Sequence, residues 1–317
     1  MRFTSVTTAL LLGLAPALST RAQESSFEIR DKAEFAKIVP ADAKVEKLAG
    51  GMTFTEGPCW FDDAQGGYLI FSDIPANHLK RWTAKDGLTV FRDDSNYANG
   101  NTRDTEGRLL TCEHQARRVT RTEKDGGVTV LADKFDGKAL NSPNDIVVKF
   151  DGTVWFTDPP YGLPKGQKQE QAGQYVFRLD PKTKQLKTVA TDFDKPNGLA
   201  FSPDEKKLYI ADSDPKNNHI RVFDVAADGT LSNGRLLCKI DKGAPDGIKV
   251  DAAGRVFSRA KDGVEIFAPT GEMIGKILLP ESCANLTFGG KGNDELFMTA
   301  SKSLYRIKLT TTGAQRR

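Results

Sequence analysis

Gly152-Thr-Val-Trp-Phe-Thr-Asp158 is the clearest of six short apolar runs that repeat along the chain and decide its fold. Each run follows a turn and is rich in the β-branched and aromatic residues that are typical of a buried strand. The runs recur roughly every 40 to 54 residues, an interval typical of propeller blades. The other five are Gly67–Asp73, Gly107–Glu113, Lys207–Asp212, Gly254–Arg259 and Asp294–Thr299.

Three further strands are expected around each run. A second strand with alternating apolar and polar residues follows it, as in His78–Thr83, and a charged turn then leads to a third, as in Leu88–Arg92. A fourth short segment precedes each run. Four strands repeated six times predict an all-β fold, a single six-bladed β-propeller over residues 23–317. A β-sandwich with extra strands is the alternative, and it does not explain the regular repeat.

The ring of blades must close, because each blade buries its faces only against its neighbours. The last repeat has no clear outer strand after Leu309, so we expect residues near Val45–Leu48 to supply it. Helical periodicity is almost absent. Only Lys32–Ile38 is expected to form a short helical turn.

Residues 1–22 have the pattern of a secretory signal peptide. Arg2 is followed by an apolar stretch, Ala9–Leu18, and then by small residues that permit cleavage after Ala17 or Ala22. The apolar stretch is about ten residues long, whereas a membrane-spanning helix needs about 20. The sequence therefore predicts a periplasmic or secreted protein that keeps no membrane anchor after cleavage.

Charge and cysteine content limit the possible partners. The chain has 45 Lys and Arg against 42 Asp and Glu, a formal net charge of +3, so a nucleic-acid or membrane-surface function is not expected. The four cysteines have no metal-binding CxxC spacing. They could form disulfides in an exported protein or serve as small buried apolar residues. They are Cys59, Cys112, Cys238 and Cys283.

The segments that precede the six runs carry an oxygen-bearing side chain at equivalent positions. In a propeller these innermost strands line the channel, so the six side chains should converge on the axis. Unpaired buried acids are costly, and a hard cation such as Ca²⁺, which takes six to eight oxygen ligands, would explain the convergence. We call these residues the axial set: Glu56, Asn99, Asn144, Asn197, Asp246 and Asn285.

Ordinary turn chemistry is the competing interpretation of the axial set. Pro-Asn-Gly and Pro-Asp-Gly are common turn sequences. Glu56 argues against it, because glutamate is a poor turn former. Other chemistries fit less well: the three histidines are scattered without an HExxH motif, and no G-x-S-x-G motif is present.

These segments resemble the SMP-30/gluconolactonase/LRE-like family, which includes regucalcin, and are most similar to its bacterial gluconolactonases. The resemblance extends over roughly residues 50–308. The stretches that carry it are Thr55–Pro58, Arg108–His114, Asn141–Val147, Trp155–Gly162, Lys195–Leu199, Pro245–Gly247 and Phe288–Gly290.

The resemblance implies a six-bladed propeller with one divalent cation in the channel, commonly Ca²⁺, with Zn²⁺, Mn²⁺ or Mg²⁺ as other options. The matching ligand positions are Glu56, Asn197 and Asp246. Asn144 matches a residue that binds the metal in some members and the substrate in others. Asn99 and His114 are further expected substrate contacts. Some animal members have an arginine where this chain has Ser142, so their sugar preference does not transfer.

The function implied is hydrolysis of a sugar lactone. The cation would polarise the ring carbonyl, and either Asp246 or the metal would activate water. A longer loop that contains Asp158 and Tyr161 is expected to form part of a lid. Two other functions remain open: phosphotriester hydrolysis at the same metal site, and a non-catalytic binding propeller that calcium rigidifies. The sequence leaves the oligomeric state open.

Overall fold

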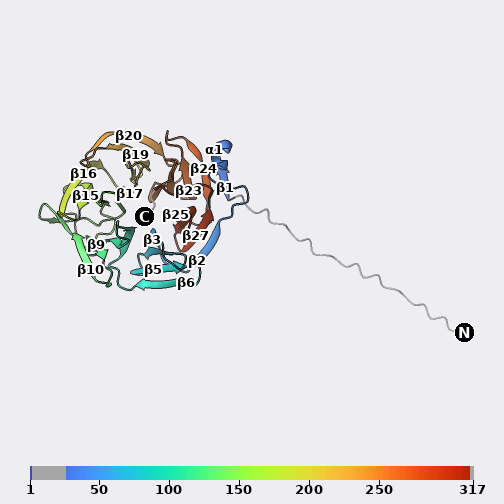
Figure 1. The fold of residues 1–317 in the computed structure, drawn as a ribbon, viewed down its shortest axis with the longest axis horizontal. Helices are drawn as coiled ribbons and strands as arrows, with labels where there is room; N and C mark the ends of the chain where they lie inside the picture. Colours follow the sequence, from blue (N-terminus) through green and yellow to red (C-terminus); the bar gives the residue numbers. More distant parts are fainter. Residues whose placement is uncertain (2–25, 315–317) are drawn as a thin grey trace.

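Antiparallel sheets stand like blades around a central channel (Figure 1). The structure is a computed structural model and describes Met1 and residues 26–314. Within these residues there are six sheets of four or five strands and one two-stranded hairpin. The predicted six-bladed β-propeller is therefore confirmed. Apart from Met1, the expected signal peptide lies outside the described residues.

Strand order in each blade follows the chain outward from the channel, with two N-terminal strands added at the rim. From channel to rim, the blades contain β3 (Thr55–Phe61), β4 (Tyr68–Asp73), β5 (His78–Thr83) and β6 (Gly87–Arg92); β7 (Ala98–Arg103), β8 (Leu109–Glu113), β9 (Arg118–Thr122) and β10 (Val128–Ala132); β13 (Ile146–Val148), β14 (Val154–Asp158), β15 (Gln174–Asp180) and β16 (Gln185–Phe193); β17 (Pro196–Phe201), β18 (Lys207–Asp212), β19 (His219–Val225) and β20 (Leu231–Lys239); β21 (Ile248–Val250), β22 (Val256–Ala260), β23 (Gly263–Phe267), β24 (Met273–Leu278) and β1 (Phe27–Ile29); β25 (Cys283–Gly289), β26 (Glu295–Ala300), β27 (Ser303–Lys308) and β2 (Glu46–Gly50). The hairpin is formed by β11 (Lys134–Phe135) and β12 (Lys138–Ala139).

The N-terminal part of the described chain closes the ring. Strand β2 pairs with β27, with Glu46 opposite Arg306, which confirms the predicted outer strand of the last blade. Strand β1 adds a fifth strand beside β24, which no sequence pattern predicted. Between them lies α1 (Lys32–Ala36), the expected short helix, whose N-terminal amides are capped by the Asp31 carboxylate.

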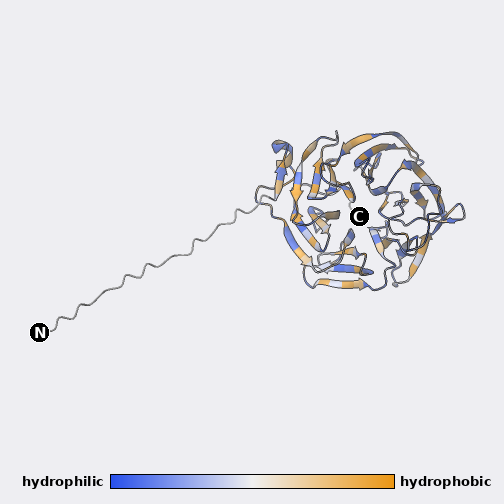
Figure 2. Cartoon of the chain, turned by 180° about the vertical axis from the view of Figure 1, so that it is seen from behind, coloured by the Kyte–Doolittle hydropathy of each residue, from blue (hydrophilic) through white to orange (hydrophobic). Residues whose placement is uncertain are grey.

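The core consists of apolar layers between neighbouring blades. Trp60 of the first blade stacks on Phe297 of the last, with ring centroids 5.0 Å apart, and Trp155 packs edge-on against Phe201 of the next blade. Inner strands such as β8 and β14 are buried along their whole length, because both faces of a blade meet a neighbour. Figure 2 shows the hydrophobic segments that the strands contribute to these layers. Burial of these layers is the main favourable contribution to folding.

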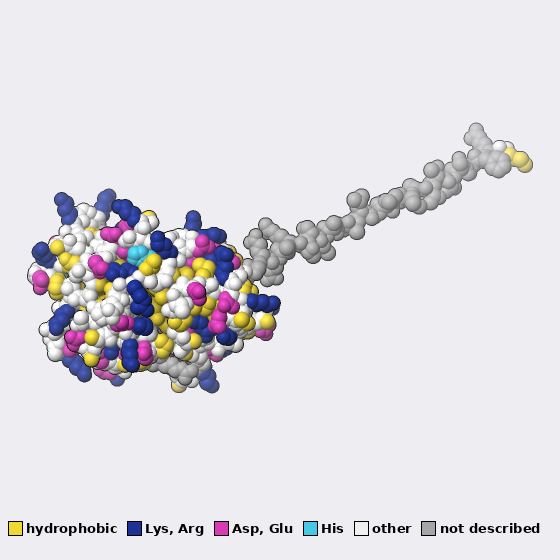
Figure 3. Space-filling view, turned by 90° about the horizontal axis from the view of Figure 1, so that it is seen from above, with side chains coloured by type: hydrophobic (Ala, Val, Ile, Leu, Met, Phe, Trp, Pro, Cys, Tyr) yellow, Lys and Arg dark blue, Asp and Glu magenta, His cyan; other side chains and the backbone are white. Residues whose placement is uncertain are grey.

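The described surface carries side chains of both charges. Basic and acidic side chains are interspersed over the face drawn in Figure 3. No helix within residues 26–314 is long and apolar enough to cross a membrane. All four cysteines are buried free thiols, as the second interpretation of them predicted. Burial raises the pKa of Cys59 to about 11, so this thiol is unreactive near neutral pH.

Candidate functional site

A cavity of about 450 Å³ opens at one end of the channel, and we call it the acidic cavity. Every residue that the sequence assigned to catalysis, metal binding or substrate binding lies in its wall. Asn285, the remaining axial residue, is absent from the lining. The lining consists of Phe54, Glu56, Ile74, Asn99, His114, Asn144, Tyr161, Asn197, Ser213, Ala244, Pro245, Asp246 and Arg259.

The glycines that follow axial residues let neighbouring inner strands approach closely. A Cβ added to Gly198 would lie 2.0 Å from the main-chain oxygen of Asp246, and the Gly198 amide donates to that oxygen at 3.1 Å. The pairing of β17 with β18 also shifts register between Pro196 and Leu199. Such a bulge re-aims the side chains it contains. This Pro-Asn-Gly sequence is therefore a contact between blades, and the turn interpretation is wrong here.

Glu56 is held as a buried acid on β3, with only 3% of its surface exposed. Its Oε2 accepts hydrogen bonds from the Gly57 amide at 2.9 Å and from Nδ2 of Asn285 at 3.0 Å. Burial raises the pKa of Glu56 well above its ordinary value, and the charge of Asp246 adds to this effect. The structure therefore places the two carboxylates in the wall of the same cavity, near enough for the charge of one to affect the other.

Asp246 lies just before β21, and its side chain is 19% exposed, toward the acidic cavity. Burial raises its pKa to about 7, although Arg259 opposes the shift. The Arg259 guanidinium is 4.0 Å from the Asp246 carboxylate and donates to the main-chain oxygens of Cys283 and Ala244. Asp246 is thus poised to exchange a proton near neutral pH.

Sequence reasoning missed Arg259 and Asp145. In the other five blades a small side chain occupies the place that corresponds to Arg259. The single large, charged side chain at this place could therefore have been recognised from the sequence. Asp145 follows Asn144, where four of the axial residues are followed by glycine. It is buried, and Asn285 Nδ2 lies 3.5 Å from its carboxylate. Asp145 therefore brings a third acid to the channel beside the acidic cavity.

The residues of the acidic cavity fit a divalent cation by their donor chemistry. The Oδ1 atom of Asn197 is buried and has no hydrogen-bond partner in the structure. With Glu56 and Asp246 it forms a set of oxygens of the kind that Ca²⁺ prefers. No group of three His, Cys, Asp or Glu side chains within the described residues is arranged to hold a metal. A cation here would therefore depend on the amides as well as the two acids.

His114 and Asn99 form a buried polar pair in the cavity wall. Nδ2 of Asn99 is 3.2 Å from Nε2 of His114, whose residue is only 5% exposed. Burial lowers the pKa of His114 to about 4, so the imidazole is neutral at physiological pH. It can orient a ligand by hydrogen bonding but does not supply a charge.

The loop between β14 and β15 covers part of this wall. Gly162 packs on His114 so closely that a Cβ would lie 2.1 Å from the ring. The Ser142 hydroxyl donates to the Pro159 main-chain oxygen and accepts from the Gly162 amide. Tyr161 is 47% exposed and lines the cavity.

Asp158, by contrast, is fully buried and is not part of the cavity lining. Its carboxylate accepts from the Asn141 amide at 2.7 Å. This acid therefore supports the start of the loop, and its expected place in the lid is wrong.

Comparisons with known proteins show which family the chain resembles. The family model described as the SMP-30/Gluconolactonase/LRE-like region matches residues 54–302. A gluconolactonase from Zymomonas mobilis is 33% identical over 303 residues, covering 87% of this chain and 84% of that protein. The solved structure of a gluconolactonase from Xanthomonas campestris has 35% identity and a TM-score of 0.83, covering 89% of this chain and 94% of that one.

A more distant relative is the regucalcin of Macaca fascicularis, which is 27% identical over 263 residues and covers 78% of this chain and 83% of that protein. The family model, the Zymomonas protein and the Xanthomonas structure each extend over most of the propeller. The chain therefore belongs to the SMP-30/gluconolactonase/LRE-like family.

Proposed function

We propose that the protein is a lactonase that hydrolyses a sugar lactone and depends on a divalent cation, most readily Ca²⁺. The observation that carries this proposal is the placement of buried Glu56 and partly buried Asp246 in one cavity wall, with an Asn197 oxygen that has no hydrogen-bond partner among the described residues. The likeness to gluconolactonases supports the choice of substrate class.

Glu56, Asn197 and Asp246, with Asn144 beside them, would hold the cation. When bound, it would act as a Lewis acid toward the lactone carbonyl oxygen, which gains negative charge as water adds to the carbonyl carbon. Side chains of the protein would supply the proton transfer and the remaining charge stabilisation. Asp246, whose side chain faces the acidic cavity, would accept the proton of the attacking water and return it to the ring oxygen as the C–O bond of the ring breaks. Arg259 contributes a fixed positive charge near the developing oxyanion.

Polar groups around the wall suit a hydroxylated substrate. Asn99 and neutral His114 form one polar edge, and Ser213 and Tyr161 also line the cavity. Tyr161 lies in the loop that Ser142 anchors, so it would cover a bound lactone and limit the entry of water. These residues orient the ring and hold no charge that changes near neutral pH.

Chelation tests the proposal directly. Hydrolysis of glucono-1,5-lactone, followed in a pH-stat, should fall at least a hundredfold with chelator and recover when Ca²⁺ is restored, since the cation and base act together (about 10²–10⁴-fold for the base). Asp246→Asn should lose activity to a similar degree. Asp228→Asn, in the exposed turn after β19, is the matched control and should leave the rate unchanged.

Three results would overturn the assignment. Full activity in the presence of chelator would show that hydrolysis does not need a divalent cation. Turnover of a phosphotriester without turnover of any lactone would show that the substrates are phosphotriesters and not lactones. A melting temperature that rises with Ca²⁺, without hydrolysis of any lactone, would identify a binding propeller.

We also propose that residues 1–22 are a signal peptide and that the protein is periplasmic or secreted. The charged start, the short apolar stretch and the small residues near Ala22 support this. Mass spectrometry of the protein from a periplasmic extract or the medium should show a chain that begins near Gln23. Recovery of the full-length chain from the cytoplasm would contradict the proposal.

A further inference from the structure

A second cavity, of about 90 Å³, lies in the channel apart from the acidic cavity, and we call it the distal cavity. The two cavities share no lining residue. The same inner strands reach both cavities. On β3, Glu56 lines the acidic cavity and Trp60 lines the distal cavity. On β17, Asn197 lines the acidic cavity and Phe201 lines the distal cavity. The distal cavity is therefore a separate space along the same axis.

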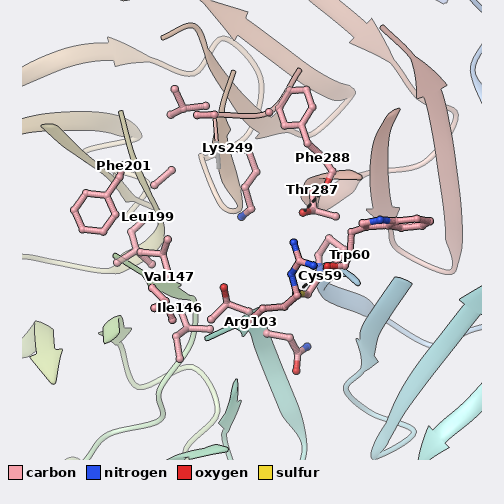
Figure 4. A pocket seen from close by; sticks show the side chains of 18 of the residues that line it. Cys59, Trp60, Arg103, Ile146, Val147, Leu199, Phe201, Lys249, Thr287 and Phe288 are labelled. Atoms are coloured by element: carbon pink, nitrogen blue, oxygen red, sulfur yellow. Dashed lines mark hydrogen bonds between the residues drawn. The ribbon is translucent and has the colours of Figure 1, made fainter. Parts of the chain in front are cut away.

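The charges of the distal cavity are all positive. Within residues 26–314, its lining includes Lys249 and Arg103 but no aspartate or glutamate. Figure 4 shows Lys249 projecting into the space, with Arg103 at its margin beside Thr287. The other lining side chains are mostly apolar, and include Val147, Leu199, Ile146, Phe201 and Phe288. A cavity of this kind attracts an anion and repels a metal ion.

Both cations keep capacity for further hydrogen bonds. An ammonium group has three donors, and the structure gives Lys249 one hydrogen bond, to the main-chain oxygen of Ile248 at 3.1 Å. A guanidinium has five N–H groups, and Arg103 makes one ion pair, with Asp62 at 3.2 Å. Because Asp62 is 61% exposed, water weakens this pair. An anion that enters the cavity would find donors from both sides.

The positive charge of Lys249 is partly balanced by the carboxylate of Asp145. The lysine charge lowers the pKa of Asp145, which burial otherwise raises. No hydrogen bond joins this ammonium to a carboxylate in the described structure, so the attraction acts through space. The ammonium therefore remains available on the side that faces the distal cavity.

We propose that the distal cavity binds a small carboxylate, whose oxygens accept hydrogen bonds from Lys249 and Arg103 while its short alkyl part packs on the apolar wall. A guanidinium suits a carboxylate because its paired N–H groups match the two oxygens. The cavity is small, about 90 Å³, which favours a ligand of the size of acetate or propionate. The apolar wall favours propionate over a fully hydrated inorganic ion.

Calorimetric titration of the full chain with propionate tests this site. One ion should bind per chain, and acetate should bind more weakly. Lys249→Met, which keeps the length of the side chain, should lower the association constant at least about tenfold, as loss of a charged hydrogen bond does. Lys124→Met, in the exposed turn before β10, is the control and should match the wild type. Arg103→Met is a second variant that should weaken binding in the same direction.

The alternatives give different results. Binding that Asp246→Asn abolishes and Lys249→Met leaves unchanged would place the ion in the acidic cavity and overturn the proposal. Equal affinity for chloride, phosphate and propionate would show an anion site without selectivity for carboxylate, and would overturn the ligand class. Absence of saturable binding to the folded wild type would overturn the site itself. The lactonase assay has no part in this test, so the two proposals fail independently.

Discussion

The raised pKa of Asp246 should make the stability of the metal-free protein depend on pH. The pKa of Asp246 is raised from 3.8 to about 7, so the folded chain holds a proton that the unfolded chain releases at lower pH. The stabilising contribution is therefore complete below about pH 4 and is lost as the pH rises through 7. In chelator, the melting temperature should be higher at pH 5 than at pH 8.

The Asp246→Asn variant supplies the comparison for this prediction. It should flatten the pH dependence between pH 4 and 8, because a difference of one between the folded and unfolded pKa values corresponds to about 1.4 kcal/mol in the free energy of unfolding. Calorimetric melting at a series of pH values measures both proteins. A melting temperature that rises from pH 5 to pH 8 in the metal-free wild type would contradict the assigned direction.

Single residues show what pattern reasoning could and could not reach. The axial side chains were found because each sits at the same place in a repeat. Asp145 and Arg259 break the repeat, and they were missed because a repeat displays only what the blades share. In the sequence, Ser142 was notable only because some family members have an arginine at this position. In the structure, its hydroxyl joins Pro159 and Gly162 of the loop between β14 and β15.

At the scale of elements, the close contact between inner strands should be intolerant of a methyl group. In Gly198→Ala the new Cβ would overlap the Asp246 main-chain oxygen, so β17 or the segment before β21 must shift. We expect a loss of at least about 2 kcal/mol in the free energy of unfolding, with a fall in Ca²⁺ affinity. Denaturant melts and calcium titration measure the two effects.

Gly50→Ala is the control for that substitution. Its Cβ would meet only the flexible end of the Lys47 side chain, at 3.1 Å, on the rim strand β2. It should change stability little and leave Ca²⁺ affinity unaltered. Equal losses in the two variants would show that the inner contact has no special role.

At the scale of the whole molecule, closure of the ring by β2 should decide whether the propeller folds. Deletion of residues 1–50 removes β2 and β1, leaving the outer edges of β27 and β24 unpaired. We expect an aggregated or unfolded product by circular dichroism and gel filtration. Deletion of residues 1–22 alone should leave the melting temperature unchanged, and a well-folded product of the longer deletion would refute the role of β2.

The six blades, the closing strand and the axial set could all be determined from sequence, because a repeat exposes its spacing and its shared residues without knowledge of any contact. Only the tertiary structure decided which atoms meet across the channel. The partner of Glu56, the guanidinium beside Asp246, the burial of Asp158 and the distal cavity all depend on side chains from different blades. Their distances follow from how the blades pack, and no local pattern records packing.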